Sequence, residues 1–300
     1  SAQPERLTVV ARADSVSFLV LFLKGWLYFL AGESAPAAAA LDQALALASA
    51  AELAPEQAAA HIYRALLLLE QPPNAAEARA RALAHLHQAV RLDPSSFAAH
   101  YNLALAYGCW CDPDGERARA FAEIASALAL RREDDCAHAL AGDLYMQERR
   151  WQEAVAAYDR ATRLRHDNAA WWNRLGRAYL AAGNTQGAEA AFHTALELGR
   201  NALAESKDQH AWRELALTYR ALGLYREALE AYHQALAQGD DAAETYRGLG
   251  LVYRYLGQVT EALSAYEKAY VAFPDDPVLQ IEWGDLYREI GEAEQAAQHY

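Results

Sequence analysis

Three stretches of the chain repeat one pattern: Leu175–Leu198 reads LGRAYLAAGNTQGAEAAFHTALEL, Leu215–Gln238 reads LALTYRALGLYREALEAYHQALAQ, and Leu249–Ala272 reads LGLVYRYLGQVTEALSAYEKAYVA. In each, an aromatic residue is followed four residues later by Gly, then by Ala, a second aromatic residue and a second Ala. The tyrosines at the first aromatic position recur every 34 residues, apart from one step of 40, and are Tyr145, Tyr179, Tyr219, Tyr253 and Tyr287. This fixed period predicts a solenoid of stacked helix pairs.

The spacing within one unit explains which residues the solenoid needs. One stripe of a first helix, at positions i, i+3, i+4 and i+7, carries Trp172, Leu175, Gly176 and Tyr179. Gly183 is placed to end that helix, and Ala188, Phe192 and Ala195 form the matching stripe of a second helix. Small residues let the two backbones approach, so we expect these positions to be packing contacts and not ligand contacts.

The pattern resembles the tetratricopeptide repeat (TPR), in the form found in bacterial TPR proteins, and the resemblance covers nearly the whole chain. It implies an all-α fold, an α-solenoid of about seven and a half helix-turn-helix repeats that form a right-handed superhelix. The family register gives an N-terminal extension over residues 1–17 and one solenoid over 18–300, with repeats at about 18–51, 58–96, 97–134, 135–168, 169–202, 209–242, 243–276 and 277–300. The last repeat stops at Tyr300 inside its second helix, so we expect the sequence to be a fragment or to continue into further segments.

Composition excludes several functional classes. The net charge of −13 argues against a nucleic-acid partner, because phosphates require a basic surface. Three cysteines in 300 residues argue against a disulfide framework and favour a reducing compartment, so we expect a cytoplasmic protein.

The sequence also contains one candidate set of four metal ligands, which are Cys109, Cys111, Cys136 and His138. In the repeat register the two pairs should lie about 15 Å apart, so we predict no metal and no cofactor.

No catalytic motif is present. The sequence contains no P-loop, GxGxxG, HExxH or GxSxG pattern. Its ten histidines are scattered, and its carboxylates alternate with arginines as on solvated helix faces. We therefore predict that the chain is not an enzyme.

The most apolar stretch, Val16–Leu30, has three interpretations. A membrane span needs about 20 apolar residues, and this run is shorter and contains Lys24. A signal peptide would have basic residues before the run and a cleavage site after it, and Arg6 and Arg12 do precede it. The third interpretation, the first helix of the first repeat, is favoured because the family register fits at four positions, Gly25, Tyr28, Gly32 and Ala37.

The resemblance implies that the first helices line a concave groove that binds peptides or helices of partner proteins. In the C-terminal half the inner positions carry polar candidates for partner binding, which are Asn173, Arg177, Arg213, Arg220, Arg247, Arg254 and Arg288. In the N-terminal half the candidates are the aromatic residues Phe22, Trp26 and Phe29. Guanidinium groups bind carboxylates bidentately, so this ladder predicts an acidic partner segment. The alternative is that local acids pair with the arginines, and these acids are Glu214, Glu244, Glu282, Asp285 and Glu289.

The sequence therefore predicts a non-catalytic scaffold or adaptor that binds another protein. Two alternatives stay open: a regulatory arm of a larger enzyme or signalling protein, and a module that self-associates through its N-terminal apolar face. We expect Phe22, Trp26 and Phe29 to be covered by residues 1–13, by a second copy of the chain or by a partner segment.

Overall fold

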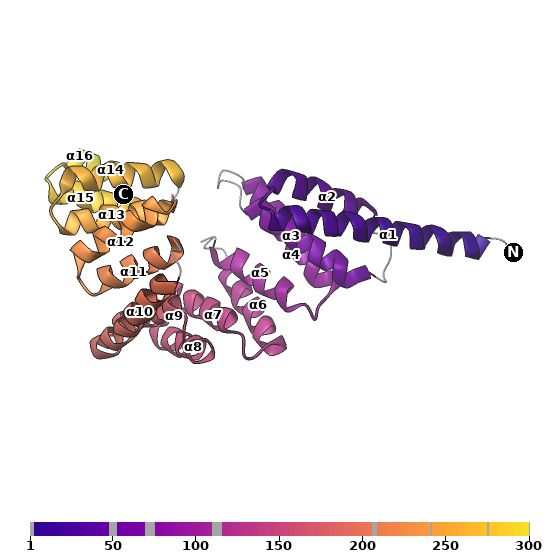
Figure 1. Ribbon diagram of the computed structural model, residues 1–300, viewed down its shortest axis with the longest axis horizontal. Helices are drawn as coiled ribbons and strands as arrows, with labels where there is room; N and C mark the ends of the chain where they lie inside the picture. Colours follow the sequence, from indigo (N-terminus) through magenta and orange to yellow (C-terminus); the bar gives the residue numbers. More distant parts are fainter. Residues whose placement is uncertain are drawn as a thin grey trace. The chain divides into compact units, whose positions relative to one another are not determined.

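The computed structural model describes residues 3–47, 53–69, 76–109, 116–205, 209–240, 242–274 and 276–299. Within these residues the protein forms sixteen α-helices and no strand (Figure 1). The helices are α1 Gln3–Leu30, α2 Ser34–Leu47, α3 Ala54–Leu69, α4 Ala76–Leu92, α5 Phe97–Cys109, α6 Glu116–Leu130, α7 Asp135–Gln147, α8 Trp151–Leu164, α9 Ala169–Ala181, α10 Thr185–Glu205, α11 Gln209–Ala221, α12 Tyr225–Ala237, α13 Ala243–Tyr255, α14 Val259–Ala272, α15 Pro277–Glu289 and α16 Ala293–His299. The prediction of an all-α solenoid is confirmed.

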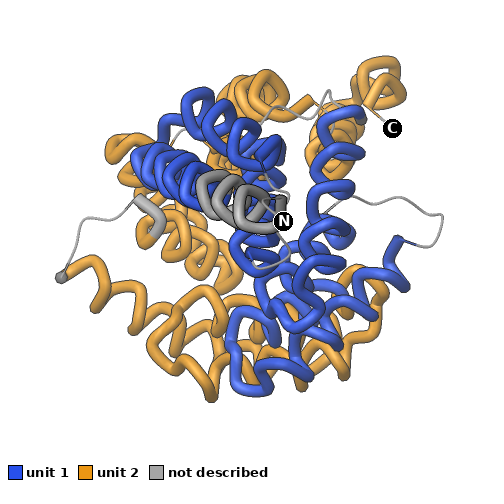
Figure 2. The backbone as a smooth tube through the Cα atoms, turned by 90° about the vertical axis from the view of Figure 1, so that its right-hand side faces the viewer, with its two compact units in different colours: residues 1–144 blue, residues 145–300 orange. Residues whose placement is uncertain are grey.

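The chain divides into two compact units, residues 1–144 and 145–300, which Figure 2 shows in blue and orange. In unit 1 the pairs α1/α2, α3/α4 and α5/α6 follow one another, and the first helices α1, α3 and α5 contact their neighbours in turn. In unit 2 the pairs are α9/α10, α11/α12, α13/α14 and α15/α16, and their first helices again lie side by side. Each unit is thus a stack of helix pairs in which the first helices form one surface.

A glycine ends each of the first helices α9, α11, α13 and α15. Gly183, after α9, has φ +80°, and its amide donates to the Leu180 carbonyl at 3.0 Å while the Asn184 amide donates to the Tyr179 carbonyl at 2.8 Å. These are the bonds of a left-handed C-terminal cap, which glycine adopts without a Cβ clash. Gly223, Gly257 and Gly291 have the same conformation, so the glycine period of the sequence sets the helix ends.

The small and aromatic positions form the core, as the sequence predicted. Phe192 of α10 is buried, and its ring lies where a Cβ on Gly176 of α9 would be only 2.6 Å away. Tyr232 and Tyr266, at the equivalent position of the next two repeats, are also fully buried. Each helix pair is therefore held by an aromatic ring against small residues.

Helix α1 differs from the predicted first helix. It begins at Gln3 and runs for 28 residues, so residues 3–14 continue the helix instead of folding back over Phe22, Trp26 and Phe29. Figure 1 shows this end of α1 extending past α2. No helix in the described part of the chain has both the length and the apolarity that a membrane crossing requires.

Candidate functional site

The surface formed by α9, α11, α13 and α15 carries the polar candidates, and we call it the first-helix face of unit 2. Asn173 of α9 is buried in this surface. Its Nδ2 donates to the backbone carbonyl and to Oε2 of Glu214, both at 3.2 Å, and its Oδ1 accepts from Thr218 Oγ1 at 2.8 Å. Because this amide is buried and hydrogen-bonded, Asn173 joins α9 to α11 and is not available to a partner.

Arg213 and Arg247, one repeat apart, hold the start of the following repeat. Arg213 Nη1 donates to Oδ1 of the buried Asp240 at 3.2 Å, and Asp240 also accepts from Thr245 of α13. Arg247 Nη1 donates to Asp276 Oδ2 at 2.8 Å, while Oδ1 of the same carboxylate caps the N-terminus of α15. Both guanidinium groups therefore neutralise a carboxylate at a repeat boundary.

Arg254 and Arg288 also have carboxylate partners. Arg254 of α13 donates from Nε to Glu289 Oε2 at 2.9 Å, from Nη2 to Oε1 of the same residue, and lies 3.8 Å from Asp285 Oδ2. The hydrogen bond lowers the pKa of Glu289 and raises that of Arg254. Arg288 is exposed and pairs with Asp285 within α15 at 2.8 Å. The local pairing that the sequence left as an alternative is confirmed for Arg247, Arg254 and Arg288, since Arg247 also lies 4.0 Å from Glu282.

Arg177 and Arg220 differ from the other arginines of this face. Among the described residues neither has a carboxylate oxygen within 4.0 Å. Arg177 is exposed and Arg220 is half-buried. The reason is in the sequence: Glu289 stands 35 residues after Arg254, whereas Tyr255 stands at that distance after Arg220.

Arg220 lies close enough to the half-buried Glu282 and to the buried Tyr232 and Tyr266 to influence their ionisation. Burial raises the pKa of Glu282. The positive charges of Arg247 and, to a smaller extent, of Arg220 oppose this increase. Burial likewise raises the pKa of Tyr232 and of Tyr266, and Arg220 lowers both. The hydroxyl group of Tyr232 is buried without a hydrogen-bond partner in the described structure, whereas that of Tyr266 lies beside Arg254. This end of the face therefore combines Arg220, which has no carboxylate oxygen within 4.0 Å among the described residues, with groups whose burial raises their pKa.

Two of the aromatic candidates of unit 1, Phe22 and Phe29, pack against a neighbouring helix of the unit. The ring of Phe22 lies 6.3 Å from that of Tyr63 on α3, and the ring of Phe29 lies 5.1 Å from it. Phe22, Phe29 and Trp26 are all half-buried. The sequence reasoning missed another face of α1, whose exposed residues are Val16, Val20, Leu23, Leu27 and Leu30. Their alternating steps of four and three residues were the signal that would have identified it.

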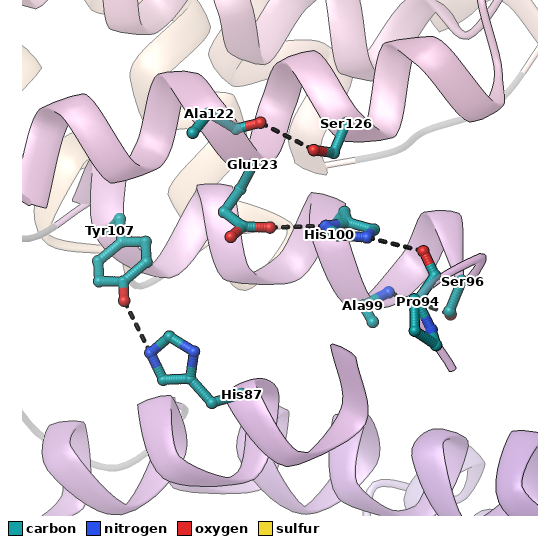
Figure 3. Close-up of polar contacts among 9 residues, drawn as sticks. All are labelled: His87, Pro94, Ser96, Ala99, His100, Tyr107, Ala122, Glu123 and Ser126. Carbon is teal, nitrogen blue, oxygen red and sulfur yellow. Dashed lines mark hydrogen bonds and ion pairs between the residues drawn. The ribbon is translucent and has the colours of Figure 1, made fainter. Parts of the chain in front are cut away.

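Polar side chains of unit 1 connect neighbouring helices, as Figure 3 shows. His87 Nε2 of α4 and the Tyr107 hydroxyl of α5 are 2.8 Å apart. His100 of α5 lies between Glu123 Oε2 of α6, at 2.6 Å from Nδ1, and the Pro94 carbonyl, at 3.0 Å from Nε2. Both nitrogens of this buried imidazole are engaged, so the group is arranged to hold α5 in place.

The cysteine candidates fall partly outside the description. Cys111 and the side chain of Cys109 lie outside the described residues. Cys136 lies near Asp134 and Asp135, with possible ligand atoms within 4.8 Å of one another, while His138 Nε2 donates to the Arg132 carbonyl at 2.9 Å. The imidazole of His138 is thus used in the turn before α7.

Comparison with known proteins identifies tetratricopeptide repeats in the sequence and the same fold in solved structures. A tetratricopeptide repeat family model matches residues 139–203 and 213–277. Tetratricopeptide repeat protein 37 of Xenopus laevis is 28% identical over 223 residues, which cover 74% of this chain and 13% of that protein. This chain therefore spans only a small part of that relative's length.

Solved structures of similar fold include a tetratricopeptide repeat protein from Parabacteroides merdae, with a TM-score of 0.65, 16% identity, and coverage of 94% of this chain and 99% of that chain. The Cut9–Hcn1 hetero-tetramer of the APC/C gives a TM-score of 0.57 at 19% identity, over 97% of this chain and 56% of that one. Yeast Tom70 gives 0.55 at 15% identity, over 88% and 54%. The period, the helix pairs and these matches agree: the chain has the tetratricopeptide repeat fold, and the family model matches it over residues 139–203 and 213–277.

Proposed function

We propose that this protein is a non-catalytic scaffold that binds a partner protein on the first-helix face of unit 2, with a partner carboxylate at Arg220. The tetratricopeptide repeat fold supports a role in protein–protein interaction, because stacked repeats present extended surfaces to other chains. One structure of similar fold, Cut9–Hcn1, is itself a hetero-tetramer.

The observation that carries the proposal is the difference between Arg220 and Arg254. The two residues occupy the same register position one repeat apart, and Arg254 is paired with Glu289 and Asp285 of the next first helix. At Arg220 the chain supplies no such carboxylate within 4.0 Å among the described residues. A glutamate or aspartate of a partner would make at Arg220 the contact that the chain makes for itself at Arg254.

Neighbouring residues suit an amphipathic acidic segment. Arg177 of α9 is exposed one repeat before Arg220 and would provide a second contact for a carboxylate. Leu180 of α9 and Ile281 of α15, both at inner positions of the repeat register, are exposed apolar residues. We therefore propose a partner peptide or helix with at least one carboxylate and with apolar side chains beside it.

The charge balance of the face limits how strongly an acidic partner binds. Arg213, Arg247, Arg254 and Arg288 are already paired with carboxylates of the same unit. Only the remaining arginines attract a partner, so the electrostatic contribution is modest and decreases as salt screens it.

The test is affinity capture from native lysate at low and high salt, with the captured proteins identified by mass spectrometry. The variants are Arg220→Glu and the matched control Arg226→Glu, which reverses an exposed arginine on α12. We expect one or more partners to bind the intact protein and Arg226→Glu, to be lost at high salt, and to be absent from Arg220→Glu. Arg254→Glu is unsuitable because it breaks the pair with Glu289 and destabilises the stack. Partners that bind Arg220→Glu as well as they bind the control would contradict the proposal.

A further inference from the structure

Helix α1 is apolar on two opposite sides. On its inner side Phe18 is 1% exposed, and Gly25 lies so close to Leu41 of α2 that an added Cβ would be 2.8 Å from that side chain. On the other side a stripe of large apolar residues is exposed, and we call these five residues the α1 stripe: Val16, Val20, Leu23, Leu27 and Leu30. An amphipathic surface helix has one apolar face, so an apolar second face indicates a further packing partner.

The spacing of the α1 stripe is that of a helix–helix seam. Its residues follow steps of four, three, four and three, which is the heptad pattern of positions a and d. The stripe lies within a helix of 28 residues. A helix of this length is about 42 Å long, enough for a seam of several turns.

A hollow on the α1 stripe has the geometry of a hole in such a seam. It has a volume of about 420 Å³ and is lined by Val20, Leu23, Lys24, Leu27 and Tyr28. Four of these residues stand at i, i+3, i+4 and i+7, the positions that surround a knob side chain from a facing helix. The lining is apolar apart from Lys24, so it suits apolar side chains of a second helix.

We infer that the occupant of the α1 stripe is α1 of a second copy of this chain, which gives a symmetric dimer. The stripe is self-complementary, because the same residues supply both the knobs and the holes. Lys24 is the only charged residue in Val16–Leu30, so the surface offers little to a charged partner and matches an equally apolar helix.

The area of the stripe agrees with a dimer interface. Its five residues are 48% to 62% exposed, which amounts to roughly 500 Å² of mainly apolar surface, a size at which a contiguous patch on a monomer is typically functional. Two copies would bury about 1,000 Å² from these side chains alone. Flanking residues of the two long helices would bring the total into the range of about 1,200–2,000 Å² found in stable interfaces.

The experiment is light scattering coupled to gel filtration over a range of concentrations, with the intact chain of 33.0 kDa. We expect a mass of twice that value for the intact chain. Leu27→Glu should reduce the mass to that of a monomer, because two carboxylates would meet at the seam. Leu27 is 60% exposed, so the change should leave the fold intact, which far-UV circular dichroism checks. The matched control is Val271→Glu, at an apolar residue of α14 that is 82% exposed, and it should remain a dimer.

A monomeric intact chain at every concentration would overturn the inference, and so would a Leu27→Glu variant that stays dimeric. Equal dissociation of Leu27→Glu and Val271→Glu would also overturn it, because the effect would then not be specific to the α1 stripe. Arg220→Glu serves as an independent reference, since the inference predicts that this variant dimerises like the intact chain. The outcome is therefore separate from that of the proposed partner site in unit 2.

Discussion

Replacing Gly176 by alanine tests the packing of a helix pair directly. A Cβ at this position would lie 2.6, 2.8 and 2.9 Å from three ring carbons of Phe192, whereas ordinary contacts begin at 3.4 Å. The ring would have to move by about 0.8 Å, and Phe192 is 2% exposed, so it has no free space to move into. We expect overpacking to cost about 1–3 kcal/mol of unfolding free energy. The gain of about 1 kcal/mol from replacing a helical glycine by alanine offsets part of this cost.

Gly199 is the matched control because it is also a glycine inside a helix, so replacing it by alanine gives the same gain in helix propensity. It lies in α10 of the same repeat and is buried, but a Cβ there would be 3.4 Å from Leu215, an ordinary contact. Gly199→Ala should therefore be neutral or stabilising by up to about 1 kcal/mol. The difference between the two variants then measures the overpacking alone, about 1–3 kcal/mol.

Urea unfolding followed by circular dichroism measures both glycine variants. Hydrogen exchange of the α9 and α10 amides adds a local readout, because repeat arrays can unfold in parts. If Gly176→Ala and Gly199→Ala have equal unfolding free energies, the close approach of α9 to Phe192 does not limit packing, and the reasoning from the repeat register fails.

Three further predictions concern polar contacts. Asp276→Asn should keep the N-terminal cap of α15 but lose the ion pair with Arg247, at a cost below about 1 kcal/mol of unfolding free energy. Asp276→Ala should lose both the cap and the ion pair, at a cost of about 1–3 kcal/mol. Urea unfolding of both variants separates the two roles. Asn173→Leu should destabilise the α9–α11 contact by about 1–3 kcal/mol, because it removes the buried hydrogen bonds that Asn173 makes with Glu214 and Thr218, and hydrogen exchange of α9 and α11 amides measures this. His61 lies 2.8 Å from His85 between the two Nδ1 atoms, and burial lowers its pKa from 6.5 to about 4. Between these pH values the unfolded chain binds a proton at residue 61 that the folded chain does not bind. The contribution of His61 to the unfolding free energy is therefore fully present above about pH 6.5 and is lost as the pH falls towards about 4. Because solvent screens this half-buried pair, we expect the unfolding free energy to fall by about 1 kcal/mol from pH 7 to pH 5, as measured by urea unfolding at both pH values. An equally large fall in the His61→Gln variant would contradict the assignment to His61.

The sequence predicted most of the fold because each repeat is specified locally. Gly183 ends a helix and Phe192 fills the space beside Gly176, and both effects act within one helix pair, so the period reveals them. The extent of α1 was harder to predict. Its first residues lie outside the repeat pattern, so the register placed the start of the helix near residue 18 and not at Gln3.

The faces of α1 were assigned less well for a related reason. Phe22 and Phe29 are large aromatic residues at inner register positions, and they suggested an open binding surface. In the structure they pack against Tyr63 of α3, the neighbouring first helix. A hydrophobic pattern on a single helix shows which side is apolar but does not say which of two apolar sides the next repeat covers. That choice depends on the stacking of repeats, which the sequence of one helix does not contain.

The arginine ladder shows how recurrence in a repeat protein can be interpreted. A residue type that recurs at one register position can serve either the stacking of repeats or a ligand, and recurrence alone favours neither. The deciding feature is whether an acid recurs with it about one repeat later: Arg213 is followed by Asp240 after 27 residues, Arg247 by Asp276 after 29, and Arg254 by Glu289 after 35. These arginines are partners of the next repeat. Arg220 recurs without its acid, since position 255 is a tyrosine, and it is this break in the paired pattern that supports a contact with another protein.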